Sequence, residues 1–389
     1  MNKELTYKIA KVIPKPLRNL IKKFYNPIIP QTLKIGYGEV LMPKENLVFM
    51  LSKLKEVLKN KGGDIIEFGV YKGGSIIFFA KILMELNIKK NKLLILQAPF
   101  LFLFQLISLI KLIRKFKINI LHSHWIIPQG ISGAIVKRIF KIKHVLTIHG
   151  ADLFVLLKMP FGKEIIKFVI KNSDEVTCVN HEIKEKIKKI IDKKNINVIP
   201  MGVNVKDYLT KPKFNNKILF LGRLAEKKGV KYVLEAAKYL SKFKFYIAGD
   251  GPLRNELELF VKRNKIKNVR FLGYIHGKNK IKLIKESGIF IIPSIHTKGG
   301  DREGLPVSLL EAMAASKAII TTDVGGIKDL IKNDYNGIII KEKNYNEIVN
   351  AVSRLKKDFA KKLGSNARKT VLDYDWKIIG MKHYNILKR

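Results

Sequence analysis

Pro293-Ser-Ile-His-Thr-Lys-Gly-Gly-Asp-Arg-Glu-Gly-Leu-Pro-Val-Ser-Leu-Leu-Glu-Ala-Met-Ala314 is the stretch on which the interpretation of the whole chain depends. The apolar run just before it, residues 289–292, predicts the end of a buried strand, and the polar residues that follow predict a loop. The last third predicts a helix, with Pro306 at the first helical position, where a missing N–H costs nothing. The first turn then points free N–H groups at whatever lies above Gly304 and Leu305, which makes a ready site for an anion.

Two carboxylates bracket this helix start. Glu303 lies just before the helix, and Glu311 lies roughly 8 Å further along it than Pro306, at a rise of about 1.5 Å per residue. One carboxylate can therefore reach the reacting end of a ligand and the other a hydroxyl-rich part, while a diphosphate between them lies over the N–H groups. This arrangement suits a nucleotide sugar.

The stretch from Glu303 to Ala314 resembles the signature of the retaining family-4 glycosyltransferases, also described as glycosyl transferases group 1. The resemblance implies that Glu303 contacts the donor sugar, that the backbone at Gly304, Leu305 and Pro306 contacts sugar or phosphate, and that Glu311 holds the ribose hydroxyls. It also implies the GT-B fold, an α/β architecture of two facing Rossmann-like domains with an interdomain cleft. Whether Glu303 attacks the sugar or only positions it stays open.

A second motif of the same family begins at Gly222. Residues 217–229 read as a strand, a tight loop and the start of a helix, and Gly222-Arg-Leu-Ala-Glu-Lys-Lys-Gly229 matches the family's G-R-L-x-x-x-K-G. A guanidinium can bind phosphate oxygens as a fork and an ammonium as a point charge. The resemblance gives these roles to Arg223 and Lys228, and it places the nucleobase at the turn of Tyr274.

Polar residues end two strands predicted in the first half of the chain. His122 and His124 follow one strand, and His149 and Asp152 follow the next, at the edge of a parallel sheet where ligands bind. His149-Gly-Ala-Asp152 resembles the family's T-H-G-x-D element, which implies that His149 reaches the donor sugar. The predicted catalytic residues are therefore Glu303, His149 and Asp152. A metal site is not expected, because the histidines lie on separate strand ends without a cysteine.

Residues 42–83 resemble two families at once. Asp64-Ile-Ile-Glu-Phe-Gly-Val-Tyr-Lys-Gly-Gly-Ser75 reads as a strand and a glycine loop, and Gly73 and Gly74 match the donor-side loop of a family-4 glycosyltransferase. The sequence of residues 42–83 is more similar to the start of macrocin-type O-methyltransferases. The next predicted strand, residues 92–97, ends in Gln97 instead of an acidic residue that would hold ribose. The spacing to His122 predicts a first domain shortened by one βα unit.

The run from Leu93 to Ile110 has no charged residue and is long enough to raise a membrane span. Gln97, Pro99 and Gln105 interrupt it, so a buried strand followed by a very apolar helix is favoured. No secretory signal precedes it. Leu17, Leu20 and Phe24 share one face of a basic segment that is typical either of an interfacial helix or of a helix packed on the protein.

The 389 residues carry a formal net charge of +43 and a single cysteine, Cys178, in an apolar run. The lysines are spread along the whole chain without a nucleic-acid-binding motif, so nucleic acid is not expected as a partner. Anionic lipid and diphosphate substrates are the favoured partners. Cys178 is expected in the core and excludes an intrachain disulfide.

The sequence predicts a leader at 1–60, a first Rossmann-like domain at 61–204, a second at 205–372, and a helix at 373–389 returning to the first. The predicted activity is retaining, metal-independent and cofactor-free hexosyl transfer from a nucleotide sugar to a glycan or lipid-linked acceptor of the cell envelope. The expected location is cytoplasmic, peripheral on the inner face of the membrane. Two alternatives stay open: a nucleotide-sugar-binding protein with impaired transfer, and a fusion with a vestigial methyltransferase-like segment.

Overall fold

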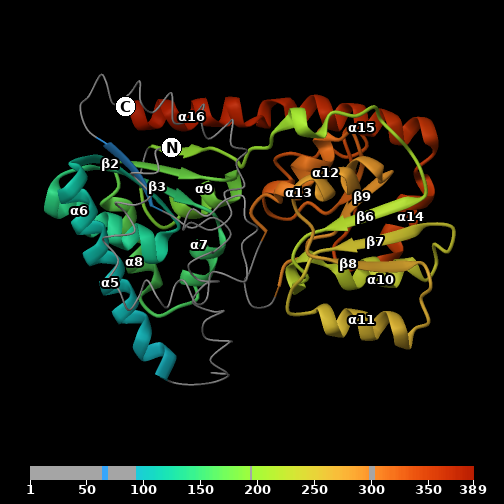
Figure 1. Cartoon of the computed structure of the whole chain (residues 1–389), viewed down its shortest axis with the longest axis horizontal. Helices are drawn as coiled ribbons and strands as arrows, with labels where there is room; N and C mark the ends of the chain where they lie inside the picture. Colours follow the sequence, from blue (N-terminus) through green and yellow to red (C-terminus); the bar gives the residue numbers. More distant parts are fainter. Residues whose placement is uncertain (1–63, 69–92, 193–194, 298–302) are drawn as a thin grey trace. The chain divides into compact units, whose positions relative to one another are not determined.

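The structure, a computed structural model, describes residues 64–68, 93–192, 195–297 and 303–389. All of them belong to one of the two compact units into which the chain divides. Gly73 and Gly74, the predicted leader at 1–60 and most of the methyltransferase-like segment lie outside the described residues. The described residues form two sheets of parallel strands with helices against them (Figure 1).

The first sheet has five described strands in the order β1-β2-β3-β4-β5, all parallel. They are β1 (Asp64–Phe68), β2 (Ile118–His124), β3 (Lys143–Ile148), β4 (Glu175–Cys178) and β5 (Ile196–Val198). The helices between them are α5 (Leu93–Phe116), α6 (Ile131–Phe140), α7 (Ala151–Leu156), α8 (Gly162–Lys171) and α9 (His181–Lys188), with a kinked π-helical segment at Ile126–Gly130. Buried Leu146, Ile148 and Val176 on the strands pack with Ile166 and Ile183 on the helices to form its main core.

The second sheet has six described strands in the order β11-β10-β9-β6-β7-β8. They are β6 (Lys217–Leu221), β7 (Lys244–Ala248), β8 (Val269–Gly273), β9 (Ile289–Ile292), β10 (Ala318–Thr321) and β11 (Ile338–Ile339). Their helices are α10 (Val230–Ala237), α11 (Arg254–Arg263), α12 (Gly277–Glu286), α13 (Val307–Ala314), α14 (Tyr345–Arg354) and α15 (Lys357–Val371). Short 3-10 turns add η3 (Val205–Tyr208), η4 (Glu226–Lys228), η5 (Gly325–Ile327) and η6 (Leu372–Tyr374). One continuous core joins the strands to α10, α13 and α15.

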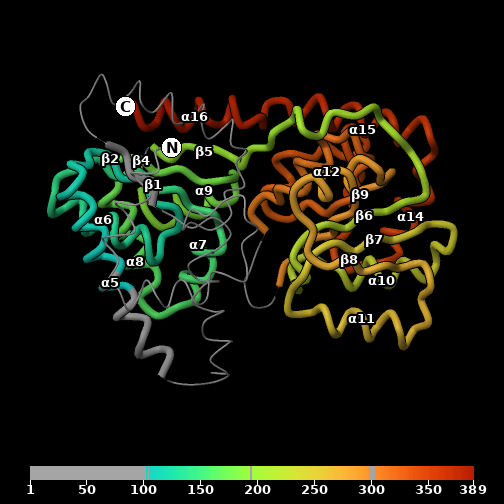
Figure 2. The backbone as a smooth tube through the Cα atoms, viewed as in Figure 1, coloured from blue at the N-terminus to red at the C-terminus, as the bar shows by residue number. Residues whose placement is uncertain are grey.

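The helix α16 (Trp376–Lys388) follows the second sheet in the chain but packs on the first (Figures 1 and 2). Ile379 and Ile386 are buried in a cluster with Ile120 of β2 and Val145 of β3. Lys143 of β3 donates hydrogen bonds from Nζ to the last carbonyls of this helix, those of Ile386 and Leu387, at 3.0 and 2.9 Å. Apolar burial and a cation at the helix C-terminus therefore hold the helix on this sheet.

The D-x-D letters at 373–375 cap this helix. Asp375 is the N-cap of α16, and its carboxylate accepts hydrogen bonds from the N–H groups of Lys377, at 3.0 Å, and Val205, at 3.2 Å. An aspartate in this role satisfies N–H groups that the first helical turn leaves without partners. The motif is thus structural, which agrees with its position beside Trp376 in the sequence.

Two predictions about local structure are wrong. Residues 93–116 form one helix, α5, so the strand predicted at residues 92–97 does not exist. A short apolar run does not distinguish strand from helix, and here its continuation to residue 116 favours the longer element. Pro306 is the N-cap of α13 and not its first helical residue, because its ψ of 118° is extended. Its carbonyl accepts from the N–H groups of Leu309 and Leu310 instead, at 3.0 and 3.4 Å.

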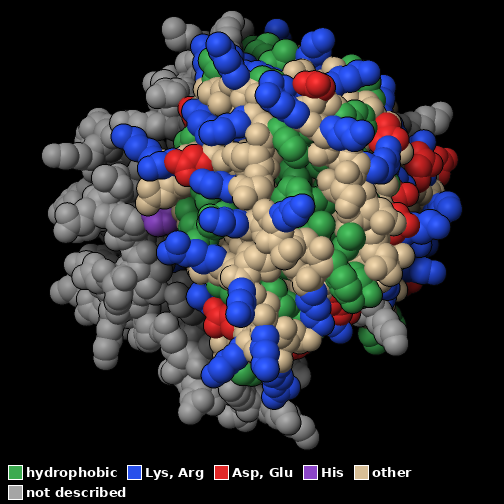
Figure 3. All heavy atoms as spheres, turned by 90° about the vertical axis from the view of Figure 1, so that its right-hand side faces the viewer, with side chains coloured by type: hydrophobic (Ala, Val, Ile, Leu, Met, Phe, Trp, Pro, Cys, Tyr) green, Lys and Arg blue, Asp and Glu red, His purple; other side chains and the backbone are tan. Residues whose placement is uncertain are grey.

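In the described part of the chain, no helix combines the length and the apolar character needed to cross a membrane. The helix α5 carries apolar residues on more than one face: Leu109 and Ile113 are buried, whereas Leu103 and Ile107 are exposed. Cys178 lies fully buried in the first core, as predicted, and burial raises the pKa of its thiol to about 12. On the face shown in Figure 3, Lys and Arg side chains are dispersed among hydrophobic and acidic ones and do not form a single stripe.

Candidate functional site

Glu303 and Lys228 form a buried ion pair, although they are 75 residues apart in the sequence. Lys228 Nζ lies 2.5 Å from Glu303 Oε2, and their side chains are only 11 and 9% exposed. Ser294 Oγ donates a further hydrogen bond to the same oxygen, at 3.3 Å. The structure therefore brings together the two charged residues that the sequence assigned to sugar and phosphate.

Two neighbouring loops place this pair. The N–H of Ile295, after β9, donates to the carbonyl of Lys227 at 2.8 Å, which ties the loop after β6 to the loop after β9. Gly229 follows directly with a φ of +65°, and a Cβ there would overlap the carbonyl of Pro293. Only glycine allows both this backbone conformation and this close approach. The G-R-L-x-x-x-K-G motif thus ends in glycine because Lys228 must reach across to the next strand.

The Glu303 carboxyl stays ionised despite its burial. Burial alone raises its pKa, but the positive charge of Lys228, then that of Lys227, and the hydrogen bonds from Lys228 and Ser294 outweigh it. The pKa of Glu303 is therefore lowered below the ordinary glutamate value. A buried carboxylate held in this state can accept hydrogen bonds from sugar hydroxyls.

Gly304 joins this site to the first sheet. Its carbonyl accepts from the N–H of Gly326 at 2.6 Å and from Asn180 Nδ2, at the end of β4, at 3.2 Å. A Cβ on Gly304 would lie 3.0 Å from the carbonyl oxygen of His149. The loop before α13 therefore touches the ends of β3 and β4, where the histidines and Asn180 lie.

Leu305 and Pro306 hold the start of α13 in place. Leu305 is buried in the core of the second sheet, and Pro306 caps the helix through its carbonyl. Helix geometry leaves the N–H groups of Val307 and Ser308 without an acceptor inside the helix. Such groups, together with the helix dipole, favour an anion at this end.

Glu311 is buried in α13 and has partners that the sequence did not reveal. Lys280 of α12 lies with Nζ 2.5 Å from Glu311 Oε1. Tyr208 of η3 forms a side-chain hydrogen bond with it, and burial, then the charge of Glu311, raises the pKa of this tyrosine above its ordinary value. Glu311 is thus held from two sides, by the Lys280 ammonium and by the Tyr208 hydroxyl.

Three histidines form a row at the ends of β2 and β3. His124 Nδ1 lies 2.9 Å from His149 Nε2, and the ring centres of His122 and His124 are 4.3 Å apart. His122 is buried and its Nε2 lies 2.8 Å from Thr147 Oγ1. The row holds His149 half-buried beside the loop of Gly304, and its hydrogen bond to His124 was not predicted.

Asp152 connects two loops of the first sheet. Its Oδ2 accepts from the N–H of Ile126 at 2.9 Å and its Oδ1 from the N–H of Gly150 at 2.8 Å. Burial raises the pKa of this carboxyl, and the backbone hydrogen bonds oppose that effect only in part. Both oxygens are used to hold backbone, so Asp152 positions the loop that carries His149.

The remaining predicted residues lie around the second sheet. Arg223 follows Gly222 in the same loop as Lys228 and is exposed, and a Cβ on Gly222 would lie 3.8 Å from Lys228 Cε. Tyr274 is 54% exposed after β8, with its ring stacked on His276 at 5.7 Å between centres. Within the described ranges, no group of three or more His, Cys, Asp or Glu residues is arranged to hold a metal ion.

Comparison with known proteins gives matches along most of the chain. A sequence profile for Glycosyltransferase Family 4 matches residues 84–207, and one for Glycosyl transferases group 1 matches residues 204–370. An uncharacterized glycosyltransferase of Methanocaldococcus jannaschii is 31% identical over 261 residues, which cover 67% of this chain and 72% of that protein. An Escherichia coli UDP-Gal:alpha-D-GlcNAc-diphosphoundecaprenol alpha-1,3-galactosyltransferase is 32% identical over 65% of this chain and 70% of its own length.

Among solved structures, Anabaena HepE in complex with UDP-glucose superposes with a TM-score of 0.65 at 16% sequence identity. The superposition covers 90% of this chain and 98% of that one. At this identity the likeness concerns the fold alone.

Proposed function

Because the chain belongs to the family-4 glycosyltransferases of group 1 and has their GT-B fold, we propose that it moves a hexosyl unit from a nucleotide sugar to an envelope glycan or lipid-linked acceptor, with retention at the anomeric carbon. The bond from the anomeric carbon to the diphosphate breaks, a bond to the acceptor oxygen forms, and the proton of the acceptor hydroxyl passes to the leaving diphosphate. The observation that carries the proposal is the buried pair of Lys228 and Glu303 beside the start of α13.

Each member of this site has a role in the proposed reaction. Lys228, Arg223 and the N–H groups at the start of α13 stabilise the negative charge that develops on the leaving diphosphate. Glu303, kept ionised by Lys228 and Lys227, receives hydroxyls of the donor sugar. Glu311 receives the ribose, in competition with Lys280. His149 and Asp152 contribute from the first sheet, His149 at the sugar and Asp152 by holding the loop.

Charge stabilisation by these residues suffices without a metal ion in this proposal. Adding EDTA is then expected to leave the transfer rate unchanged, and adding Mg²⁺ afterwards is expected to give no increase. A rate that collapses with EDTA and returns with a divalent cation would contradict metal-independent transfer.

The acceptor and the location are proposed from the relatives. The E. coli relative is named for a diphosphoundecaprenol acceptor, which is a lipid-linked substrate. A net charge of +43 favours contact with anionic lipid. We therefore place the protein in the cytoplasm, peripheral on the inner face of the membrane.

The test starts with a thermal-shift panel of UDP-, GDP- and ADP-sugars, followed by transfer and donor hydrolysis with the sugar that stabilises the protein most. Glu303→Gln keeps the size of the side chain and removes its charge, and it is expected to lower the rate on the order of 10²–10³-fold. Glu235→Gln, which removes a carboxylate of a surface pair on α10, is the matched control and is expected to keep the rate. The anomeric configuration of the product, by NMR, tests retention.

The binding-protein alternative predicts a different outcome of the same experiment. Tight binding of a nucleotide sugar, with neither transfer nor hydrolysis on any lipid or glycan extract, would favour a protein with impaired transfer. A thermal shift with S-adenosylmethionine would favour the methyltransferase-like reading of residues 42–83.

A further inference from the structure

A second concavity lies beside the site and takes no part in the roles proposed above. It is a pocket of about 450 Å³, a size ordinary for ligand sites. Phe154 of α7 and Leu157, directly after that helix, form its apolar side, and Lys186 of α9 and Lys189, directly after that helix, form its basic side. Lys328, after η5, closes it from the loops of the second sheet.

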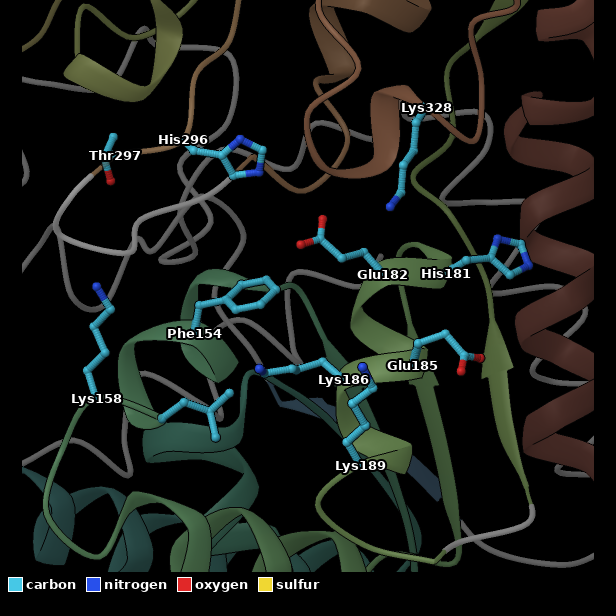
Figure 4. A pocket seen from close by; sticks show the side chains of 11 residues that line it. Phe154, Lys158, His181, Glu182, Glu185, Lys186, Lys189, His296, Thr297 and Lys328 are labelled. Atoms are coloured by element: carbon cyan, nitrogen blue, oxygen red, sulfur yellow. The ribbon is translucent and has the colours of Figure 1, made fainter. Parts of the chain in front are cut away.

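The pocket is rich in lysine ammonium groups. Lys158, Lys186, Lys189 and Lys328 line it, against the two carboxylates of Glu182 and Glu185. Figure 4 shows Lys328 pointing from the second sheet's loop towards α9, and Lys186 extending from α9 towards Phe154.

Two of the nearby acids, Glu185 and Glu342, already have partners. Glu185 already pairs with Lys188, which does not line the pocket, at 3.1 Å. Glu342 accepts from the N–H of His296 at 2.6 Å and has its Oε1 2.9 Å from the ring Nδ1. In the part of the chain that the structure describes, Lys186, Lys189 and Lys328 have no ion-pair partner. The lysines that line the pocket outnumber its carboxylates, and such an excess of positive charge favours a bound anion.

The walls of the pocket continue into the walls of the transfer site. His296 lines the pocket two residues after Ser294, whose hydroxyl holds Glu303. His181 lines it directly after Asn180, whose side chain holds the Gly304 carbonyl. A molecule anchored in the pocket therefore lies next to the two loops that hold Glu303 and Gly304.

We infer that this pocket binds the phosphate or diphosphate group of the acceptor, with Lys186, Lys189 and Lys328 as its ligands. The inference rests on the proposed transfer function and adds the chemical class of the acceptor. Phosphate suits the site because three or four separate point charges can each meet a different oxygen. Phe154 and Leu157 offer apolar surface to the part of the acceptor next to the phosphate.

The residues at the rim of the pocket beside Lys158 concern whether the bound phosphate belongs to a lipid-linked or to a soluble acceptor. Met159 and Phe161 follow it with 49 and 79% of their surface exposed, in the loop between α7 and α8. Exposed apolar side chains next to lysines suit the surface of a bilayer, whereas the pocket itself accepts any phosphate. A lipid-linked phosphate and a soluble one therefore share the same chemistry here and are separated by experiment.

The experiment is a lysine-labelling footprint on the full chain, read residue by residue by mass spectrometry. Three probes are compared: inorganic pyrophosphate, phosphatidylcholine vesicles carrying a polyprenyl diphosphate, and the same vesicles without it. Pyrophosphate is expected to slow labelling of Lys186, Lys189 and Lys328 roughly tenfold and to leave Lys188 unchanged. Protection by the diphosphate vesicles as well identifies a lipid-linked acceptor, and protection by pyrophosphate alone identifies a soluble phosphorylated one.

Two results would overturn the inference: no protection of the three lysines by either diphosphate probe, or equal protection of Lys188, which would mean general attraction to a basic surface. A paired variant test follows. Lys186→Gln with Lys189→Gln is expected to raise the KM for a phosphorylated acceptor about tenfold at unchanged donor KM, whereas Lys188→Gln changes neither. Failure of the transfer function itself is distinguishable, because it is measured separately, as the absence of both transfer and donor hydrolysis with every nucleotide sugar of the panel.

Discussion

Asp152 shows how a residue that resembles a catalytic acid acts through the backbone. Its two carboxylate oxygens accept hydrogen bonds from the N–H groups of Ile126 and Gly150, which lie in the loops that follow β2 and β3. These buried N–H groups have no substitute partner once the carboxylate is removed, and leaving a buried donor unsatisfied costs about 1–3 kcal/mol. The residue therefore holds in place the loop that carries His149.

Asp152→Ala is expected to lower the free energy of unfolding by about 2–4 kcal/mol, because two buried donors lose their acceptor. Urea denaturation followed by circular dichroism measures this change. Asp323→Ala, an exposed aspartate of the second sheet, is the control and is expected to stay within about 0.5 kcal/mol of the wild type. Equal stability of both variants would show that the Asp152 hydrogen bonds contribute nothing.

Glu303 ties stability to acid pH. Its pKa is lowered in the folded protein, so its stabilising effect is complete above the ordinary glutamate pKa and is lost as the pH falls through the lowered value. Breaking a buried pair costs about 3–5 kcal/mol, so Glu303→Gln is expected to be less stable than the wild type by that amount at neutral pH. The difference between the urea midpoints should begin to shrink as the pH falls below the ordinary glutamate pKa, and it should vanish only below the lowered pKa of the folded protein. A constant difference at every pH would contradict the lowered pKa.

At the scale of elements, loops at the carboxyl ends of the strands fit each other through glycine backbones. Gly325 opens η5 with a φ of +63°, and a Cβ there would overlap the Glu303 carbonyl oxygen. The neighbouring Gly326 donates to the Gly304 carbonyl at 2.6 Å. The position of Glu303 therefore depends on a loop that follows a different strand, β10.

Gly325→Ala is expected to lower stability by more than about 2 kcal/mol and to reduce transfer, because backbone strain adds to an overlap beside Glu303. Two glycines serve as controls that separate these effects. Gly277→Ala, with a φ of +57° and no atom within 4 Å of its Cβ, carries the strain alone and is expected to cost about 1 kcal/mol. Gly380→Ala, in open space on α16, is expected to stabilise by about 0.5–1 kcal/mol. Thermal unfolding and transfer rates measure all three.

The units of a strand followed by a loop were predictable because each has a recognisable pattern in its own stretch of sequence. A run such as residues 289–292 is apolar and short, and the polar loop and helix after it are read from Gly304 and Pro306. The partners of Glu311 were not predictable, because Tyr208 and Lys280 come from elements that no local pattern connects with α13. The prediction of a strand at 92–97 was wrong for a related reason. A short apolar run does not show whether its period is that of a strand or of a helix until the full length of the run is considered.

At the scale of the whole molecule, the chain crosses back to the first sheet after completing the second. Ile379 of α16 is buried against Ile120 and Val145, and Gly202 lies so close to Trp376 that a Cβ there would be 2.6 Å from its ring. The core of the first sheet is therefore completed by residues that follow the second sheet in sequence. Its stability should depend on them.

Ile379→Ala is expected to cost about 2–5 kcal/mol, as large-to-small changes in a packed core do. Hydrogen exchange of the β2 and β3 amides measures where the loss falls, and it should be larger there than in β6 and β7. Ile378→Ala, one residue earlier and 41% exposed, is the matched control and should change little. Equal loss in both sheets would mean that α16 stabilises the molecule as one unit.

The helix α16 is also among the last parts of the chain to be synthesised on the ribosome. At about 5–20 residues per second, a ribosome needs roughly ten to forty seconds for the approximately 180 residues between β5 and Ile379. For that interval the nascent chain carries Ile120 and Val145 uncovered, on a sheet whose own strands have all been synthesised. A chain that ends within the second sheet would therefore leave this apolar surface of the first sheet exposed to water.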